Sequence, residues 1–140
     1  MIAKDSVTVT TVVRTDPADA FRLFTEEVDS WWKRGARYRL HGGTLRLDEG
    51  RLLEGDETMG YVTAWEPGVR LGLDLITWPF QAGEATHVEV RFEAIGDGTR
   101  VTVEHRGWMR EKGAKEFRTV VGLWWGAVLP GLARAAGASS

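Results

Sequence analysis

Alternating apolar and polar residues in the second half of this chain predict two adjoining β-strands. An apolar side chain occupies every second position from residue 88 to 94, and a similar alternation returns from residue 100 to 106, after the turn Gly96-Asp97-Gly98. Such a hairpin buries one face and exposes the other, as antiparallel sheets commonly do. We therefore expect one set of side chains to face the C-terminal helix predicted below and the alternate set to face water: Val88, Val90, Phe92, Val101 and Val103 inward, and Glu89, Arg91, Thr102 and Glu104 outward.

The C-terminal stretch has a different period. From Phe117 onward, apolar residues recur at spacings of three and four, which places them on one face of an α-helix. Such a face needs an apolar partner, and the predicted strands supply it. Pro130 should kink this helix or end its regular part, and the tail 135–140 should fray. The apolar face consists of Phe117, Val120, Val121, Trp124, Val128 and Leu132, with Trp124 central in the core.

Cap and turn signals divide the rest of the chain. Asp16 followed by Pro17 is a strong helix start, and the short helix that follows carries Phe21 and Phe24. A second short helical piece is expected from Glu27 to Trp32. Clusters of glycine, proline and acidic residues bound the strands. Strands are expected at 7–13, 43–48, 51–55, 58–65, 70–77, 86–95 and 99–106.

This order of elements indicates an α+β fold: a strand, two short helices, six strands and a long helix. A chain of 140 residues suits one domain with a single core. We therefore expect residues 1–140 to form one domain, in which a curved antiparallel sheet wraps around the C-terminal helix. A pocket can form between such a sheet and helix.

Composition argues against several classes of protein. The net charge of −2 argues against a general nucleic-acid binder, and the lack of cysteine excludes disulfides, thiolate nucleophiles and cysteine-ligated metals. No apolar run approaches the roughly 20 residues of a transmembrane helix, and the N-terminus lacks a secretory signal, so a cytoplasmic protein is expected. The seven tryptophans are unusual, and large rings commonly line apolar ligand sites as well as fill cores.

An ordered set of motifs spans nearly the whole chain. It comprises residues 16–25, Trp31-Trp32, 42–46, 60–67, Arg70-Leu71, 98–107, and Gly122 with Trp125, Val128, Leu129 and Leu132. By this set the chain resembles the helix-grip superfamily of START lipid-transfer domains, polyketide cyclases and birch-pollen-allergen-like proteins. Within it, the chain looks most like the AHSA-like branch, named after the activator of the heat-shock-protein ATPase. The resemblance implies the helix-grip fold, and it implies function only loosely, because the superfamily includes lipid carriers, hormone receptors, cyclases and chaperone activators.

Groups suited to catalysis are sparse. The sequence has no nucleophile elbow, phosphate loop or dinucleotide-binding fingerprint. His105 lies on the apolar face of its strand, and a core histidine that ties this strand to the last helix is favoured over one that faces a ligand. Asp74, on the face opposite the leucines of its strand, is a weaker candidate for the pocket, and Tyr61 is a third acid or base. The three histidines are too isolated for a metal site, so neither a metal nor another cofactor is expected.

The aromatic residues make a stronger case for a ligand site. They come from segments that should converge between sheet and helix, where they either line an open cavity or fill a closed core. The basic run from Lys33 to Arg39 either flanks the mouth of such a pocket or forms a solvated loop. The expected ligand-binding residues are Trp32, Trp78, Phe80, Phe92, His105, Trp108, Phe117, Val121 and Trp124.

Three functions compete at this point. The first is a small binding protein that encloses an apolar or aromatic molecule between sheet and helix, without chemistry. The second is a polyketide cyclase-like enzyme that uses the same cavity; it ranks second because only His105, Asp74 and Tyr61 could supply its acid or base. The third is an interaction module that stimulates a chaperone ATPase. It ranks last because the activators that name the branch carry an additional domain, for which 140 residues leave no room.

Overall fold

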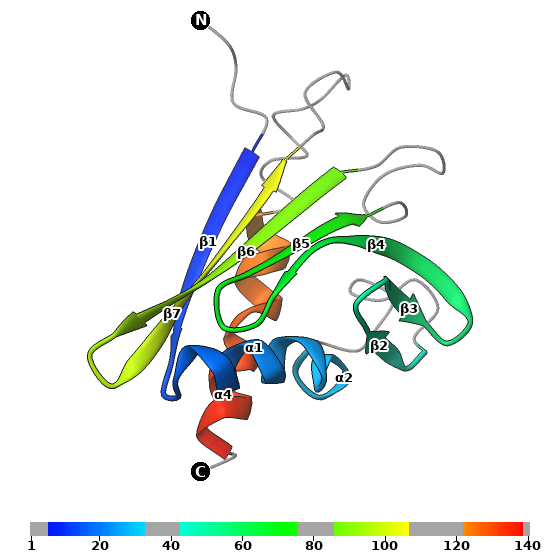
Figure 1. Ribbon diagram of the computed structural model, residues 1–140. Helices are drawn as coiled ribbons and strands as arrows, with labels where there is room; N and C mark the ends of the chain where they lie inside the picture. The colour runs from blue at the N-terminus through cyan, green and yellow to red at the C-terminus, as the bar shows by residue number, and fades with distance from the viewer. Residues whose placement is uncertain (1–5, 33–42, 76–85, 107–121, 139–140) are drawn as a thin grey trace, which may run out of the picture.

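A curved antiparallel sheet forms most of the protein. The computed structural model describes residues 6–32, 43–75, 86–106 and 122–138. Within these ranges seven strands form one sheet in the order β1-β7-β6-β5-β4-β3-β2, and neighbouring strands are antiparallel (Figure 1). The strands are β1 (Ser6–Val13), β2 (Leu45–Leu47), β3 (Arg51–Glu54), β4 (Glu57–Glu66), β5 (Arg70–Leu75), β6 (Thr86–Ile95) and β7 (Gly98–Arg106).

Two short helices connect β1 to β2, as the sequence predicts. The first, α1 (Pro17–Thr25), has Pro17 at its start, and the Asp16 carboxylate caps it by accepting a hydrogen bond from the backbone N–H of Asp19 at 2.8 Å. The second, α2 (Val28–Trp31), is one turn long. Both contact the C-terminal helical region at one end of the sheet (Figure 1).

The C-terminal region continues past the proline. Residues 122–128 are helical, Leu129 forms a turn, and α4 (Pro130–Ala138) follows. The prediction of an interruption at Pro130 is confirmed, but proline begins a new helical segment there, because its fixed φ suits a first helical turn. The prediction of a frayed tail is wrong for residues 135–138, which belong to α4. The helix α4 as a whole contacts β1, α1 and α2, and Ala136, within the predicted tail, is buried.

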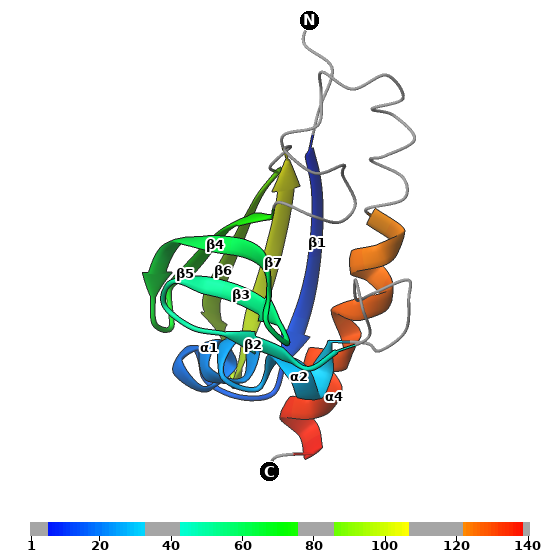
Figure 2. The same ribbon diagram turned by 90° about the vertical axis from the view of Figure 1, so that its right-hand side faces the viewer.

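Close packing brings α4 against α2. A side chain at Gly131 would collide with the carbonyl oxygen of Trp31, so only glycine permits this approach. Figure 2 shows the C-terminal helix running alongside β1 on one side of the sheet. The α+β fold with a curved sheet and a C-terminal helix is therefore confirmed. No helix in the described ranges has the length and apolar character needed to cross a bilayer.

The β6-β7 hairpin has the predicted inner face. Val90 pairs with Val103, and the valines predicted to face inward are 0% exposed. On the outer face, Arg91 is exposed as expected. Glu89 corrects the prediction: it lies on the outer face, opposite Glu104, yet it is only 8% exposed. Neighbouring charged side chains cover it, and alternation along one strand cannot reveal such cover.

Candidate functional site

A buried histidine joins three elements on the inner side of the sheet. His105 projects from β7 and is 0% exposed. Its Nε2 lies 2.7 Å from the hydroxyl oxygen of Thr86, the first residue of β6. Its Nδ1 accepts a hydrogen bond from the indole nitrogen of Trp125, in the C-terminal helix, at 3.1 Å. His105 is thus the core histidine that the sequence favours, tied to the last helix through Trp125.

These two contacts define the protonation of the imidazole ring. An indole N–H can only donate, so Nδ1 of His105 must be the acceptor and carries no hydrogen. The hydrogen of the neutral ring is therefore on Nε2, which donates to the Thr86 oxygen. Burial, with a smaller contribution from the charge of His87, lowers the pKa of His105 to about 3. The ring consequently stays neutral at ordinary pH and is poorly suited to proton transfer.

Aromatic rings form a continuous chain of contacts between the sheet and the helices. The rings are buried, and neighbouring centroids lie 4.7–6.2 Å apart. Such edge-to-face and tilted contacts are favourable beyond the area that they bury. The order is Phe92 to Phe24 (5.9 Å), Phe24 to Trp31 (4.7 Å), Trp31 to Trp32 (5.7 Å), Trp32 to Trp124 (5.0 Å), Trp124 to Trp125 (4.8 Å) and Trp125 to His105 (6.2 Å).

This series of ring contacts includes all the predicted ligand-binding residues that the structure describes. Trp32 and Trp124 are in ring contact, while Phe92 and His105 lie at its two ends. The core position predicted for Trp124 is confirmed, since it is only 6% exposed. The remaining predicted residues lie outside the described ranges: Trp78, Phe80, Trp108, Phe117 and Val121.

Three residues that contact the predicted site residues were not predicted themselves: Trp31, Thr86 and Trp125. Trp125 is more deeply buried than Trp124 and holds His105. Its place was readable in the sequence, because Trp125, Val128 and Leu132 also follow a spacing of three and four. Thr86 gives no such signal, because its importance depends on a contact with His105 on the neighbouring strand.

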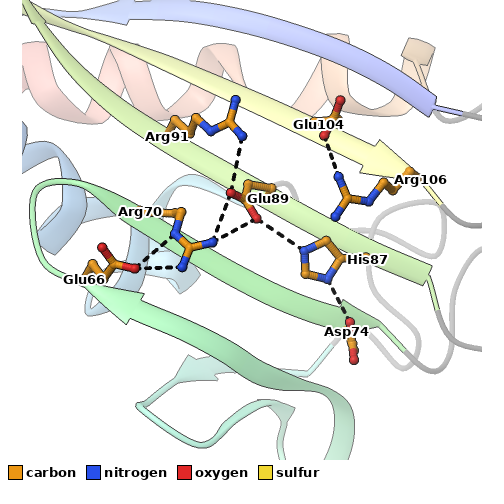
Figure 3. A network of polar contacts seen from close by, with 8 residues as sticks. All are labelled: Glu66, Arg70, Asp74, His87, Glu89, Arg91, Glu104 and Arg106. Atoms are coloured by element: carbon orange, nitrogen blue, oxygen red, sulfur yellow. Dashed lines mark hydrogen bonds and ion pairs between the residues drawn. The ribbon is translucent and has the colours of Figure 1, made fainter.

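The outer face of the same strands carries a network of charged side chains (Figure 3). Arg70 in β5 donates to Glu66 at 2.8 Å and to Glu89 at 3.3 Å. His87 lies between two carboxylates, with Nδ1 2.9 Å from Asp74 and Nε2 3.4 Å from Glu89. The network therefore links β4, β5 and β6 on the side away from the C-terminal helix.

Glu89 is the centre of this network. Burial alone would raise the pKa of its carboxyl, but hydrogen bonds from His87 and Arg70, with the charges of Arg70 and Arg91, outweigh burial and lower the pKa below its usual range. Glu89 therefore remains an anion although its side chain is only 10% exposed. A buried carboxylate needs such partners, so charged side chains and not apolar ones cover Glu89.

The three acid-base candidates do not converge. Asp74 is bound to His87 on the outer face, with its side chain 43% exposed, so the suggested pocket role for Asp74 is wrong. Tyr61 pairs with Asp74 across β4 and β5 and is 49% exposed. His105 lies on the inner face. Within the described parts of the chain, no three histidine, aspartate or glutamate side chains gather in a way that could hold a metal ion.

Comparison with known proteins agrees with this fold. A model of the family described as "Activator of Hsp90 ATPase homolog 1-like protein" matches residues 14–137. No curated protein sequence matches the chain.

Several solved structures share the fold at low sequence identity. The Aha1 dimer from Colwellia psychrerythraea superposes with a TM-score of 0.66 and 16% identity, covering 97% of this chain and 96% of that one. DynU16, from the dynemicin biosynthetic locus, superposes with a TM-score of 0.61 and 16% identity, covering 94% of this chain and 47% of that one. An HSP90 activator from Plasmodium falciparum superposes with a TM-score of 0.53 and 20% identity, covering 79% of this chain and 82% of that one. At these identities the likeness establishes the fold alone.

Proposed function

Because the chain belongs to the family of Activator of Hsp90 ATPase homolog 1-like proteins, we propose that it uses the helix-grip fold to bind a small molecule. The ligand is apolar or aromatic, it lies between the inner face of the sheet and the C-terminal helix, and it is not converted. The inner positions of β5, β6 and β7 support this proposal. The buried side chains there are apolar apart from Thr86, Thr99 and His105.

The state of His105 favours binding over catalysis. General acid-base catalysis needs a group with a pKa near the working pH and a free path to the substrate. The pKa of His105 is about 3, and its two nitrogens contact Thr86 and Trp125. The other two candidates lie on the outer face. An enzyme that relied on these three candidates would therefore lack its acid or base, whereas a binding protein needs none.

The proposal is tested by native mass spectrometry of the purified protein, followed by titration with the apolar fluorophore N-phenyl-1-naphthylamine. We expect a co-purifying small molecule, and we expect the fluorophore to quench tryptophan emission saturably. Trp78→Ala and Phe117→Ala should each weaken the response. Trp65→Phe is the control for the loss of a tryptophan, because Trp65 contacts Phe21 and is not among the expected ligand-binding residues, so its replacement should leave the affinity unchanged.

Two outcomes would contradict the proposal. If neither a co-purifying molecule nor saturable quenching appears, the aromatic rings fill a closed core. If the protein converts a polyketide-like substrate and His105→Ala abolishes the conversion while the fold is kept, the protein is an enzyme.

A second candidate function is interaction with Hsp90. The family model and the HSP90 activator from Plasmodium falciparum favour it. The test is the ATPase rate of purified Hsp90 from the same host, with and without this chain. Saturable stimulation by the folded chain, absent with the heat-unfolded chain, would support the interaction, and an unchanged rate would exclude a stimulating role.

A further inference from the structure

A series of hydrogen bonds inside the core ends at the hydroxyl group of Thr86, whose own hydrogen has no acceptor among the described residues. The indole N–H of Trp125 donates to Nδ1 of His105, so the hydrogen of the imidazole lies on Nε2 and is donated to the oxygen of Thr86. A threonine hydroxyl has one hydrogen of its own to donate. The direction of the first two bonds means that the Thr86 hydroxyl acts as an acceptor towards His105, and its own hydrogen remains to be placed.

The other buried threonines show what the fold normally provides. Thr25 donates its hydroxyl hydrogen to the carbonyl oxygen of Phe21 at 2.8 Å, and Thr99 donates to that of Thr15 at 2.7 Å. Thr86 is buried as deeply, at 2% exposure, yet no residue in the ranges that the structure describes accepts its hydrogen. A buried donor without an acceptor costs free energy, so native proteins seldom leave one unpaired.

We propose that the Thr86 hydroxyl is the polar anchor of the ligand site, donating a hydrogen bond to a neutral oxygen acceptor, such as a ketone carbonyl, on an otherwise aromatic ligand. This inference rests on the proposed binding function and narrows its ligand class. Thr86 begins the inner face of β6, two residues from Val88 and opposite Leu75 of β5. These apolar neighbours and the neutral His105 offer no positive charge to a carboxylate, whose burial would be costly.

The test compares two probes that differ in one group. In 2-acetylnaphthalene a carbonyl replaces the methylene next to the ring of 2-ethylnaphthalene, and size and shape are nearly the same. Equilibrium dialysis gives the dissociation constant of each probe. In the wild-type protein the ketone should gain the hydrogen bond, and the ratio of the two constants should change roughly tenfold in Thr86→Val in favour of the hydrocarbon. Thr86→Ser, which keeps the hydroxyl, should retain the wild-type ratio.

Two controls separate the anchor from general effects. Thr25→Val removes another buried hydroxyl, whose acceptor is in α1, and should leave the ratio unchanged. Thr86→Val also deprives His105 Nε2 of its acceptor, so its fold is checked by circular dichroism. If that variant does not fold, the infrared spectrum of the ketone bound to the wild type gives the answer. Its carbonyl band should lie at a lower frequency than in hexane, as a hydrogen bond requires.

The outcomes distinguish this inference from the function on which it rests. Equal ratios in the wild type and Thr86→Val, or a carbonyl band at the hexane frequency, would overturn the anchor and leave the binding function intact. If neither probe binds the wild-type protein, the binding function itself fails, and the anchor fails with it.

Discussion

Two histidines on adjacent strands of this protein have opposite surroundings. His105 in β7 faces the helix and exchanges hydrogen bonds with the neutral groups of Thr86 and Trp125. His87 in β6 faces outward and lies between the carboxylates of Asp74 and Glu89. The first belongs to a neutral, buried chain and the second to a charged network with partial access to water. The difference shows how β6 and β7 keep their charged side chains on the outer face, because burying an ion without compensation is far more costly than burying a paired neutral group.

The comparison also separates the two faces by their contribution to folding. Interactions on the inner face combine packing with hydrogen bonds that water cannot replace. Those on the outer face compete with water and salt, so each contributes less. Three predictions test this contrast.

The largest effect is expected for Trp125→Ala. It removes a ring that is 1% exposed and leaves Nδ1 of His105 without its donor, so it should lower the free energy of unfolding by about 3–5 kcal/mol. Chemical denaturation measures the loss. Leu123→Ala, on the same helix but 71% exposed, should change it by less than about 0.5 kcal/mol. Equal losses in the two variants would mean that the helix does not present Trp125 to the core.

An intermediate effect concerns pH. The pKa of His105 is about 3 in the folded protein against 6.5 for a free histidine, so the unfolded chain binds a proton more readily as the pH falls below 6.5. Stability is therefore fully present above this value and is lost progressively down to about pH 3. Between pH 6.5 and 5 the loss from this group should be about 2 kcal/mol.

Denaturation at several pH values, for the wild type and for His105→Gln, checks this expectation. The variant cannot titrate at this position, so its free energy of unfolding should fall less steeply below pH 6.5. Parallel curves would show that His105 takes up a proton as readily in the folded protein as in the unfolded chain, contrary to the hydrogen-bond pattern.

The smallest effect is expected on the outer face. Glu89→Gln removes the charge shared by Arg70 and His87 and should cost about 1 kcal/mol, less at high salt. Glu93→Gln is the matched control on the same strand, because its 3.0 Å ion pair with Arg100 is exposed and should contribute almost nothing. If Glu89→Gln lowered the free energy of unfolding as much as Trp125→Ala, the two faces would not differ in their contribution to folding.

Much of the fold was predictable because it depends on local patterns. Alternation along β6 and β7 gave the inner face, and the pair Asp16-Pro17 gave the start of α1. The end of the chain was less well predicted. A tail rich in alanine and glycine looks weak by itself, but it belongs to α4, a helix that contacts β1, α1 and α2 and extends to Ala138.

The candidate site was predictable only in part. Hydrophobic spacing correctly placed Trp124 in the core, and the alternation placed His105 on the inner face, because both depend on the position of one residue in its own element. The cover over Glu89 and the separation of Asp74 from His105 depend on neighbouring strands. Alternation marked both acids as outward-facing, but their partners come from residues far away in the sequence.

The sequence by itself determined the periods, the cap of α1 and the turns, and with them the order of elements and the inner face of β6 and β7, because these follow from the geometry of a single helix or strand. Only the tertiary structure decided how the faces meet. It brought Trp125 and Thr86 to the two nitrogens of His105 and left the Thr86 hydrogen without an acceptor among the described residues. Hydrogen-bond direction depends on both partners at once, and the partners here come from three elements joined only by folding.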